Sequence, residues 1–186
     1  MTKLKAIPIV DSSQVEVMRH IYNENLDSLS TKQLPYRNYE DQQQWWETNK
    51  HVLTGFLYEA IDRPDVCVGF LVLRDRGEFC TPTIALRQQD WGKGYGKEIV
   101  YDYIEKANGP MAGSQLKSNA AICHLNQKTG WQILGEREEE KGTVELLFHP
   151  GINPDRKISS AGFATVLDYL NIKNLSTDNH KSIHSK

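Results

Sequence analysis

Three glycines on alternate positions constrain this chain more than any other feature of its sequence. They are Gly92, Gly94 and Gly96, within the segment Gln89–Glu98. The residues before this segment, Phe79–Leu86, are largely apolar and β-branched, which predicts a strand. The residues after it repeat apolar side chains at helical spacing, which predicts an amphipathic helix. The glycines therefore join a strand to the first turn of a helix.

A glycine-rich junction between a strand and a helix is typical of an anion-binding site. The first N–H groups of a helix have no intrahelical partner, and the positive end of the helix dipole lies there. Glycines also lack the Cβ atoms that would keep a phosphate at a distance. The spacing fits neither common nucleotide motif, because Glu98 follows Lys97 where a Walker loop needs Ser or Thr, and Lys97 stands where the dinucleotide fingerprint needs glycine. The alternative is a tight turn without a ligand.

The segment Trp91–Gly96 (WGKGYG) resembles the pyrophosphate loop of the GNAT acyltransferases, which is written Arg/Gln-x-x-Gly-x-Gly/Ala. Trp91 takes the Arg/Gln position, and Gly94 and Gly96 take the two glycines. Tryptophan at that position resembles the branch of the family that acetylates ribosomal-protein N-termini and related amines. In the family this loop holds the diphosphate of acetyl-coenzyme A.

A second segment, Asn119–Trp131, resembles the other GNAT signature. In that signature an asparagine opens a helix and a Lys-x-Gly-aromatic sequence ends it, which matches Asn119, Lys128, Gly130 and Trp131 in spacing. The two signatures are much more specific together than either is alone. The resemblance covers about residues 3–149.

The resemblance implies the GNAT fold, an α+β fold with a mixed central sheet of six to seven strands in the order β-α-α-β-β-β-α-β-α-β-β. Strands four and five are splayed apart in that fold. Sequence patterns predict the same order, with strands over 3–10, 53–61, 66–74, 78–86, 112–116, 131–137 and 143–149 and helices over 15–25, 39–49, 94–107 and 118–129. Pro8 marks the first strand as an edge strand. A charged turn is expected at Glu138–Gly142.

The resemblance implies a GNAT domain over residues 1–149 and a C-terminal extension over residues 150–186. The extension contains one predicted helix at residues 161–170, which we expect to dock on the domain or on a second subunit, so a homodimer is one prediction. From Asn171 onward the composition is polar and predicts disorder. The 186 residues suffice for one domain with a proper core.

Composition narrows the classes of function. A net charge of −2 argues against nucleic acid as a partner. The sequence has no apolar run of membrane-spanning length, and its three widely spaced cysteines form no CxxC pair, so we expect no membrane contact and no metal site. A reduced, cytoplasmic setting is the expectation that follows.

The resemblance implies that acetyl-coenzyme A is the co-substrate and assigns residues to it. Strand residues Ile84, Ala85 and Leu86 would line the pantetheine arm, and Asn119 would contact it from the other side. The loop residues Trp91, Gly92, Lys93, Gly94, Tyr95, Gly96 and Lys97 would hold the diphosphate. The backbone amide near Leu86 is the family's usual oxyanion donor. The acceptor amine would attack the thioester directly.

The acid and base of the reaction depart from the family pattern. Asn126 stands where many members have a tyrosine that protonates the leaving thiolate, a tyrosine that the ribosomal-protein branch commonly lacks too. Glu78 is a weak candidate for the base, and its alternative is an exposed carboxylate at a hairpin edge. His124 could act as a base, but a structural histidine is the favoured interpretation.

The acceptor is expected to bind near the first two predicted helices. Aromatic residues gather there beside Glu40 and Asp41, which would suit a cationic amine or a sugar ring, or simple packing. These aromatic candidates are Tyr36, Tyr39, Trp45 and Trp46. The predicted acceptor is a small-molecule amine, an amino sugar or a protein N-terminus. The alternative function is a non-catalytic coenzyme A-binding or interaction protein on the same scaffold.

Overall fold

The computed structural model describes residues 3–29 and 34–172, which form one seven-stranded sheet with helices around it. The strands are β1 (Leu4–Pro8), β2 (Leu53–Ala60), β3 (Cys67–Asp75), β4 (Cys80–Leu86), β5 (Met111–Leu116), β6 (Gln132–Glu139) and β7 (Gly142–His149). The α-helices are α1 (Ser12–Glu24), α2 (Tyr39–Asn49), α3 (Tyr95–Ala107), α4 (Ala120–Lys128) and α5 (Ser160–Tyr169). Two short 3-10 helices, η1 (Lys50–Val52) and η2 (Gln88–Asp90), precede β2 and follow β4. From residue 173 on, the tail predicted to be disordered lies outside the described residues.

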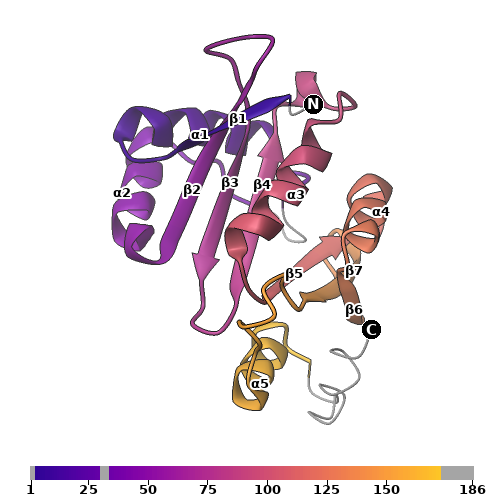
Figure 1. The fold of residues 1–186 in the computed structure, drawn as a ribbon. Coiled ribbons are helices and arrows are strands. Elements are labelled where there is room, and N and C mark those ends of the chain that lie inside the picture. Colours follow the sequence, from indigo (N-terminus) through magenta and orange to yellow (C-terminus); the bar gives the residue numbers. More distant parts are fainter. Residues whose placement is uncertain (1–2, 30–33, 173–186) are drawn as a thin grey trace.

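The sheet confirms the predicted fold class and the predicted order of elements. Its strand order is β1-β2-β3-β4-β5-β7-β6, and all neighbouring pairs are antiparallel except β4 and β5. Those two strands are parallel and share a single paired position, Cys80 with Met111. They diverge beyond it (Figure 1). As predicted, the first strand lies at an edge and ends at Pro8, where a missing N–H is tolerated.

Local signals explain where the helices begin. Asp11 caps α1 and forms a reciprocal capping box with Gln14. Asn38, Asn119 and Ser159 cap α2, α4 and α5 in the same general way, each accepting from a backbone N–H of the first turn. The exception is α3, which follows a glycine and has no side-chain cap.

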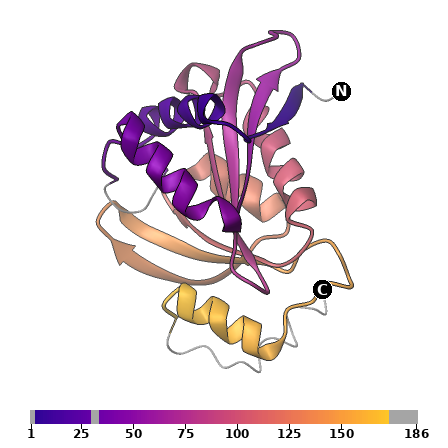
Figure 2. The same ribbon diagram turned by 90° about the vertical axis from the view of Figure 1, so that its left-hand side faces the viewer.

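Helices cover both faces of the sheet. α1 and α2 pack on one face (Figure 2), where Val15 and Trp46 contact a core that includes Phe70. α3 packs on the opposite face, where Ile99 and Val100 belong to the largest core cluster. The diverging β4 and β5 therefore lie beneath α3, which follows directly from the glycine loop.

The C-terminal helix packs on its own chain. In α5, Phe163 and Val166 contact a core formed with Val144 and Phe148 of β7, and the rings of Phe148 and Phe163 meet edge to face at 5.3 Å between centroids. Figure 2 shows α5 beneath the β6–β7 hairpin. None of the helices within residues 3–29 and 34–172 is both long and apolar enough to span a bilayer.

The β6–β7 turn is shorter than predicted. Pairing continues through Glu138 with Thr143 and Glu139 with Gly142, so two residues remain for the turn. The Thr143 hydroxyl donates to the Glu138 carboxylate at 2.7 Å, which favours this extension of the ladder. Gly142 has a φ of +116°, a conformation that favours glycine.

Candidate functional site

The glycine loop has the backbone geometry that the alternating glycines suggested. Gly92 and Gly94 have φ angles of +75° and +87°, in a region that L side chains rarely adopt. Gly94 is the N-cap residue of α3 and has no side chain to bond the first turn. The N–H groups of that turn are therefore available to an anion at the positive end of the helix.

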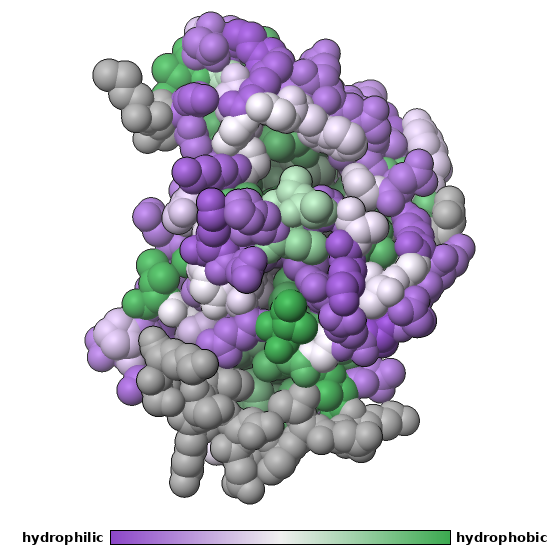
Figure 3. Space-filling model, turned by 90° about the vertical axis from the view of Figure 1, so that its right-hand side faces the viewer, coloured by the Kyte–Doolittle hydropathy of each residue, from purple (hydrophilic) through white to green (hydrophobic). Residues whose placement is uncertain are grey.

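A cavity of about 600 Å³ lies where β4 and β5 diverge. Residues 82–86 of β4 and 113–116 of β5 line its two sides, and the glycine loop reaches it at one end. Ile99, Leu125, Trp131 and Leu147 add apolar surface. Figure 3 shows the face that carries α4, on which hydrophobic side chains are exposed between hydrophilic ones. The cavity combines an apolar slot with a glycine-lined end.

Most of the residues predicted to hold the cofactor line this cavity. They are Ile84, Ala85, Leu86, Trp91, Gly92, Gly94, Gly96, Lys97 and Asn119. The side chains of Lys93 and Tyr95 do not: Lys93 pairs with Asp90, and Tyr95 is buried in the core. The side chains of these two residues are therefore engaged elsewhere in the protein.

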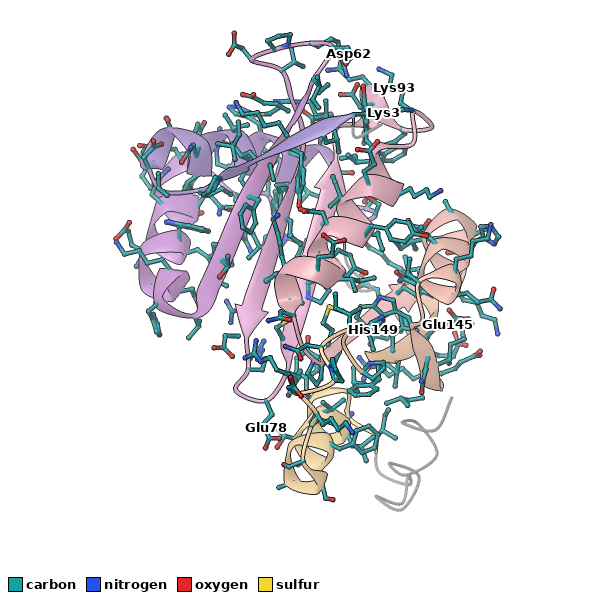
Figure 4. The ribbon with its side chains drawn as sticks, in the orientation of Figure 1. Lys3, Asp62, Glu78, Lys93, Glu145 and His149 are labelled. Atoms are coloured by element: carbon teal, nitrogen blue, oxygen red, sulfur yellow. The ribbon has the colours of Figure 1, made fainter. Side chains whose placement is uncertain are left out.

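Asp90 anchors the loop to a distant turn. Its fully buried carboxylate pairs with Lys93 Nζ and with Arg63 Nη2, both at 2.7 Å. Burial by itself would raise the pKa of Asp90, but the hydrogen bonds from Lys93 and Arg63 outweigh it, and the pKa lies below its ordinary value. Figure 4 shows Lys93 at the end of the molecule where Asp62 marks the β2–β3 turn. Asp90 therefore stays ionised and links the loop to the turn that holds Arg63.

Four side chains form a continuous polar network, and three of them, Tyr103, Gln115 and Asn126, line the cavity. The Tyr103 hydroxyl donates to Asn126 Oδ1 at 3.3 Å, and Asn126 Nδ2 donates to Gln115 Oε1 at 2.7 Å. Gln115 Nε2 donates in turn to Glu145 Oε2 at 2.6 Å. Burial raises the pKa of Tyr103 far above its ordinary value, so this phenol keeps its proton. Asn126, at the family's tyrosine position, thus serves to connect Tyr103 to Gln115.

Sequence reasoning missed three polar residues of this site. Tyr103 and Gln115 line the cavity. Because Tyr103 belongs to the apolar stripe of its helix, the sequence indicated a core residue and gave no sign that its hydroxyl joins the polar network. Asn25 Nδ2 donates to the Leu86 carbonyl at 2.9 Å, and Trp91 Nε1 donates to the same oxygen at 3.3 Å. A lone glutamine in a short strand of small residues was the one available signal for Gln115.

Glu78 lies away from the cavity (Figure 4). It is exposed at the β3–β4 hairpin, and its carboxylate accepts from the N–H and the hydroxyl of Ser159, both at 2.7 Å. These hydrogen bonds lower the pKa of Glu78. The structure thus places Glu78 at the N-terminus of α5, which does not favour a role as the base. His124 is exposed on α4 and does not line the cavity either.

A second cavity of about 290 Å³ lies on the side of α1 and α2. Among the predicted acceptor residues, Trp45 lines it, whereas Tyr36 and Tyr39 are exposed and Trp46 is buried in the core. Leu29 and Thr83 line both cavities, so the two adjoin at β4. The protein thus has two adjoining cavities that share part of their lining.

Comparisons with known proteins bear on the fold. No family model matches the chain, and a sequence search of curated proteins finds no match. Among solved structures, the spermidine N-acetyltransferase of Vibrio cholerae, in complex with CoA and spermine, has a TM-score of 0.70 at 14% identity, covering 80% of this chain and 96% of that one. The Salmonella typhimurium protein yncA, assigned as an acetyltransferase and solved with its cofactor acetyl-CoA, has a TM-score of 0.67 at 13% identity over 80% of this chain and 94% of that one.

A third structure, of a protein assigned as a phosphinothricin N-acetyltransferase, has a TM-score of 0.67 at 13% identity and covers 79% of this chain and 98% of that one. All three neighbours are similar over nearly their whole length and over the same large part of this chain. At 13–14% sequence identity, the similarity to these structures shows a shared fold and no more. The chain has the α+β fold of these N-acetyltransferases, which is the GNAT fold that its sequence predicts.

Proposed function

We propose that this chain is an acetyl-coenzyme A-dependent N-acetyltransferase that acts on a primary amine. The observation that carries this proposal is the cavity between β4 and β5, which ends at the uncapped N-terminus of α3. Its apolar slot fits a pantetheine arm. The N–H groups of the loop, with Lys97 beside them, fit a diphosphate. The residues present therefore suit this co-substrate.

The chain would act mainly by holding and orienting its two substrates. Acetyl-coenzyme A supplies an activated thioester when it is bound. The acceptor nitrogen forms the new bond to the acetyl carbon as the carbon–sulfur bond breaks, and the amine loses a proton. The Leu86 carbonyl at the end of β4 accepts two hydrogen bonds, from Asn25 Nδ2 and Trp91 Nε1, and the backbone amide near Leu86 would serve as the oxyanion donor. Tyr103 keeps its proton and is suited to donate a hydrogen bond.

One observation supports a second candidate function, that of a non-catalytic coenzyme A-binding protein. Among the described residues that line the cavity, Lys97 and Tyr103 are the two with titratable side chains, and neither is an obvious base. A coenzyme A-binding protein without catalytic activity would need no base at all. For an active enzyme, the acceptors that the sequence suggested are a small-molecule amine, an amino sugar and a protein N-terminus.

Calorimetry with acetyl-coenzyme A and an assay of thiol release over a panel of amines separate these functions. We expect binding and release of free coenzyme A in the presence of an acceptor. Binding without turnover on peptide, amino-sugar and small-molecule amines would favour the non-catalytic alternative. An absence of binding would reject the proposed site.

Replacing Gly94 by valine should weaken acetyl-coenzyme A binding by about tenfold or more. The φ of +87° is strained by about 1–2 kcal/mol for a residue with a Cβ, and a branched side chain would intrude at the N-terminus of α3. The matched control is Gly135→Ala, because Gly135 has an ordinary φ and open space at its Cβ position. Calorimetry and circular dichroism on both variants measure affinity and folding. Unchanged affinity in a folded Gly94→Val variant would contradict the loop assignment.

A further inference from the structure

The second cavity has a strongly positive wall. Arg37, Arg74 and Arg76 line it, and no aspartate or glutamate of the described residues does so. Arg37 belongs to the segment that leads into α2, whereas Arg74 and Arg76 lie at the end of β3 and in the hairpin after it. Folding thus brings three guanidinium groups from distant parts of the sequence to one cavity.

These charges have no counter-charge within the described part of the chain. None of the three arginines forms an ion pair with a described carboxylate. Their hydrogen-bond partners are neutral: Arg74 donates to Asn49 Oδ1 and Arg37 donates to Gln42 Oε1, each at 2.9 Å. Burial lowers the pKa of Arg74, and the charge of Arg76 lowers it further. A bound anion would relieve this repulsion.

Aromatic rings lie against all three guanidinium groups. The Arg37 guanidinium carbon lies 4.2 Å from the centroid of Tyr22 and 4.8 Å from that of Trp45, and Arg76 lies 5.1 Å from the Tyr169 ring. A guanidinium that contacts a ring through its face keeps the N–H groups at its edge for other partners. Those edges match the two oxygens of a carboxylate or phosphate.

The wall around Arg37 also has more donors than acceptors. Because Arg37 can only donate, its bond to Gln42 fixes the orientation of that amide and leaves Gln42 Nε2 as a buried donor without a partner among the described residues. The buried Tyr22 hydroxyl has none there either. Both residues line the cavity and contact Arg37. A ligand group rich in acceptor oxygens would complement this wall.

We propose that the second cavity binds an anionic group of the acceptor, so that the substrate is a primary amine that also carries a carboxylate or a phosphate. This inference rests on the proposed function and specifies its acceptor. Leu29 and Thr83 line both cavities, which would let the anion stay at the arginines while the amine reaches the co-substrate. The carboxylates of Glu40 and Asp41, from which a cationic acceptor was expected, are absent from the lining.

A panel of matched amines tests the inference. Thiol release is measured with 4-aminobutyrate, butylamine and 1,4-diaminobutane, and with O-phosphoethanolamine against ethanolamine. We expect kcat/KM to be about tenfold or more higher for the anionic member of each set, and lowest for the diamine. A preference for the carboxylate or for the phosphate identifies which anion the cavity recognises. Equal or better use of the amines without an acidic group, or of the diamine, would overturn the inference.

Calorimetry distinguishes a wrong inference about the acceptor from a wrong proposed function. Binding of acetyl-coenzyme A together with turnover that ignores acceptor charge would reject the anionic acceptor and leave the proposed function standing. If acetyl-coenzyme A does not bind, the proposed function fails. Binding of 4-aminobutyrate or O-phosphoethanolamine alone would then still support the cavity as an anion site, and its absence would overturn that too.

Variants of Arg76, the exposed arginine among the three, test whether the arginine-lined wall causes the preference for anionic amines. Arg76→Gln should raise KM for the anionic amine about tenfold while KM for acetyl-coenzyme A is unchanged, and Arg76→Glu should improve the use of 1,4-diaminobutane. Arg156→Gln is the matched control, because it removes the same charge from an exposed site outside both cavities. An equal loss with amines that carry an acidic group and amines that lack one, or the same effect in Arg156→Gln, would overturn the assignment.

Discussion

Asp90 shows how one buried carboxylate can position a glycine-rich loop. It belongs to η2, immediately before the glycines, and its two ion-pair partners come from the loop itself and from the β2–β3 turn. The charge is stable in this buried place because Lys93 and Arg63 approach it closely. The loop would otherwise be held mainly by glycines, which restrict the backbone least of all residues.

Replacing Asp90 by asparagine should lower the free energy of unfolding at pH 7 by about 1–2 kcal/mol, since two charge-assisted hydrogen bonds to partly exposed partners are lost. The folded-state pKa of Asp90 is lowered, so its contribution is present above the ordinary pKa and is lost as pH falls through the folded value. The difference between wild type and variant should therefore be constant from pH 8 to 5 and shrink below about pH 4. Urea unfolding across this range measures it.

Asp155→Asn is the control for this comparison, because Asp155 is exposed and forms no ion pair with a described residue. It should leave the free energy of unfolding nearly unchanged at every pH. A loss in Asp90→Asn that stays the same at pH 3 would show that the carboxylate charge is not the cause.

Among the elements, α5 depends on contacts at both its first turn and its apolar face. Ser159 caps the helix by accepting from the Gly162 N–H at 2.9 Å, and Glu78 of the β3–β4 hairpin bonds both polar groups of Ser159. Phe163 then packs against Phe148 of β7. The extension after residue 149 is in this way connected to two separate parts of the sheet.

Ser159→Ala should destabilise the protein by about 1 kcal/mol through loss of the N-cap. Glu78→Gln should leave kcat for acetyl transfer unchanged, because the carboxylate bonds Ser159 and does not line the cofactor cavity. Thermal unfolding and thiol release on both variants measure these effects. A tenfold or larger fall in kcat for Glu78→Gln, with stability retained, would restore Glu78 as a base candidate.

For the whole molecule, the important feature is a sheet in two parts joined at one strand pair. β4 and β5 pair only at Cys80 and Met111, and the cofactor cavity separates them beyond that point. Tyr103, Trp131 and Leu147 share one core cluster, so the two parts also meet through packing under α3. A ligand in the cavity would contact both parts at once and would stabilise the fold as a unit.

Acetyl-coenzyme A at one hundred times its dissociation constant should add about 2.7 kcal/mol to the free energy of unfolding. Slower hydrogen exchange should be concentrated in β4, β5 and the first turn of α3, which line the cavity, and should be absent from α2. Acetyl-pantetheine, which lacks the diphosphate, is the matched control and should stabilise less at equal concentration. Protection centred on α2 or α5 would contradict the proposed binding mode.

The sequence by itself determined the elements and the glycine loop that joins β4 to α3. Each element is encoded within a few residues, by a capping residue such as Asp11, by a periodic apolar face, or by glycines that allow a left-handed backbone at Gly92 and Gly94. Such signals act over one or two turns of chain. They therefore predicted the order of strands and helices. The family resemblance added cofactor residues, most of which line the cavity between β4 and β5.

Only the tertiary structure decided which side chains from distant segments meet. The hairpin after β3 places Glu78 at α5 instead of at the cofactor cavity, and it places Arg76 beside Arg74 and Arg37. The hydrogen bond between Asn126 and Gln115 likewise depends on how α4 packs over β5. Strand pairing and packing determine these side-chain contacts. The local propensities of the sequence do not encode them. The charge of the second cavity, and with it the inferred anionic acceptor, is therefore a property of the folded molecule.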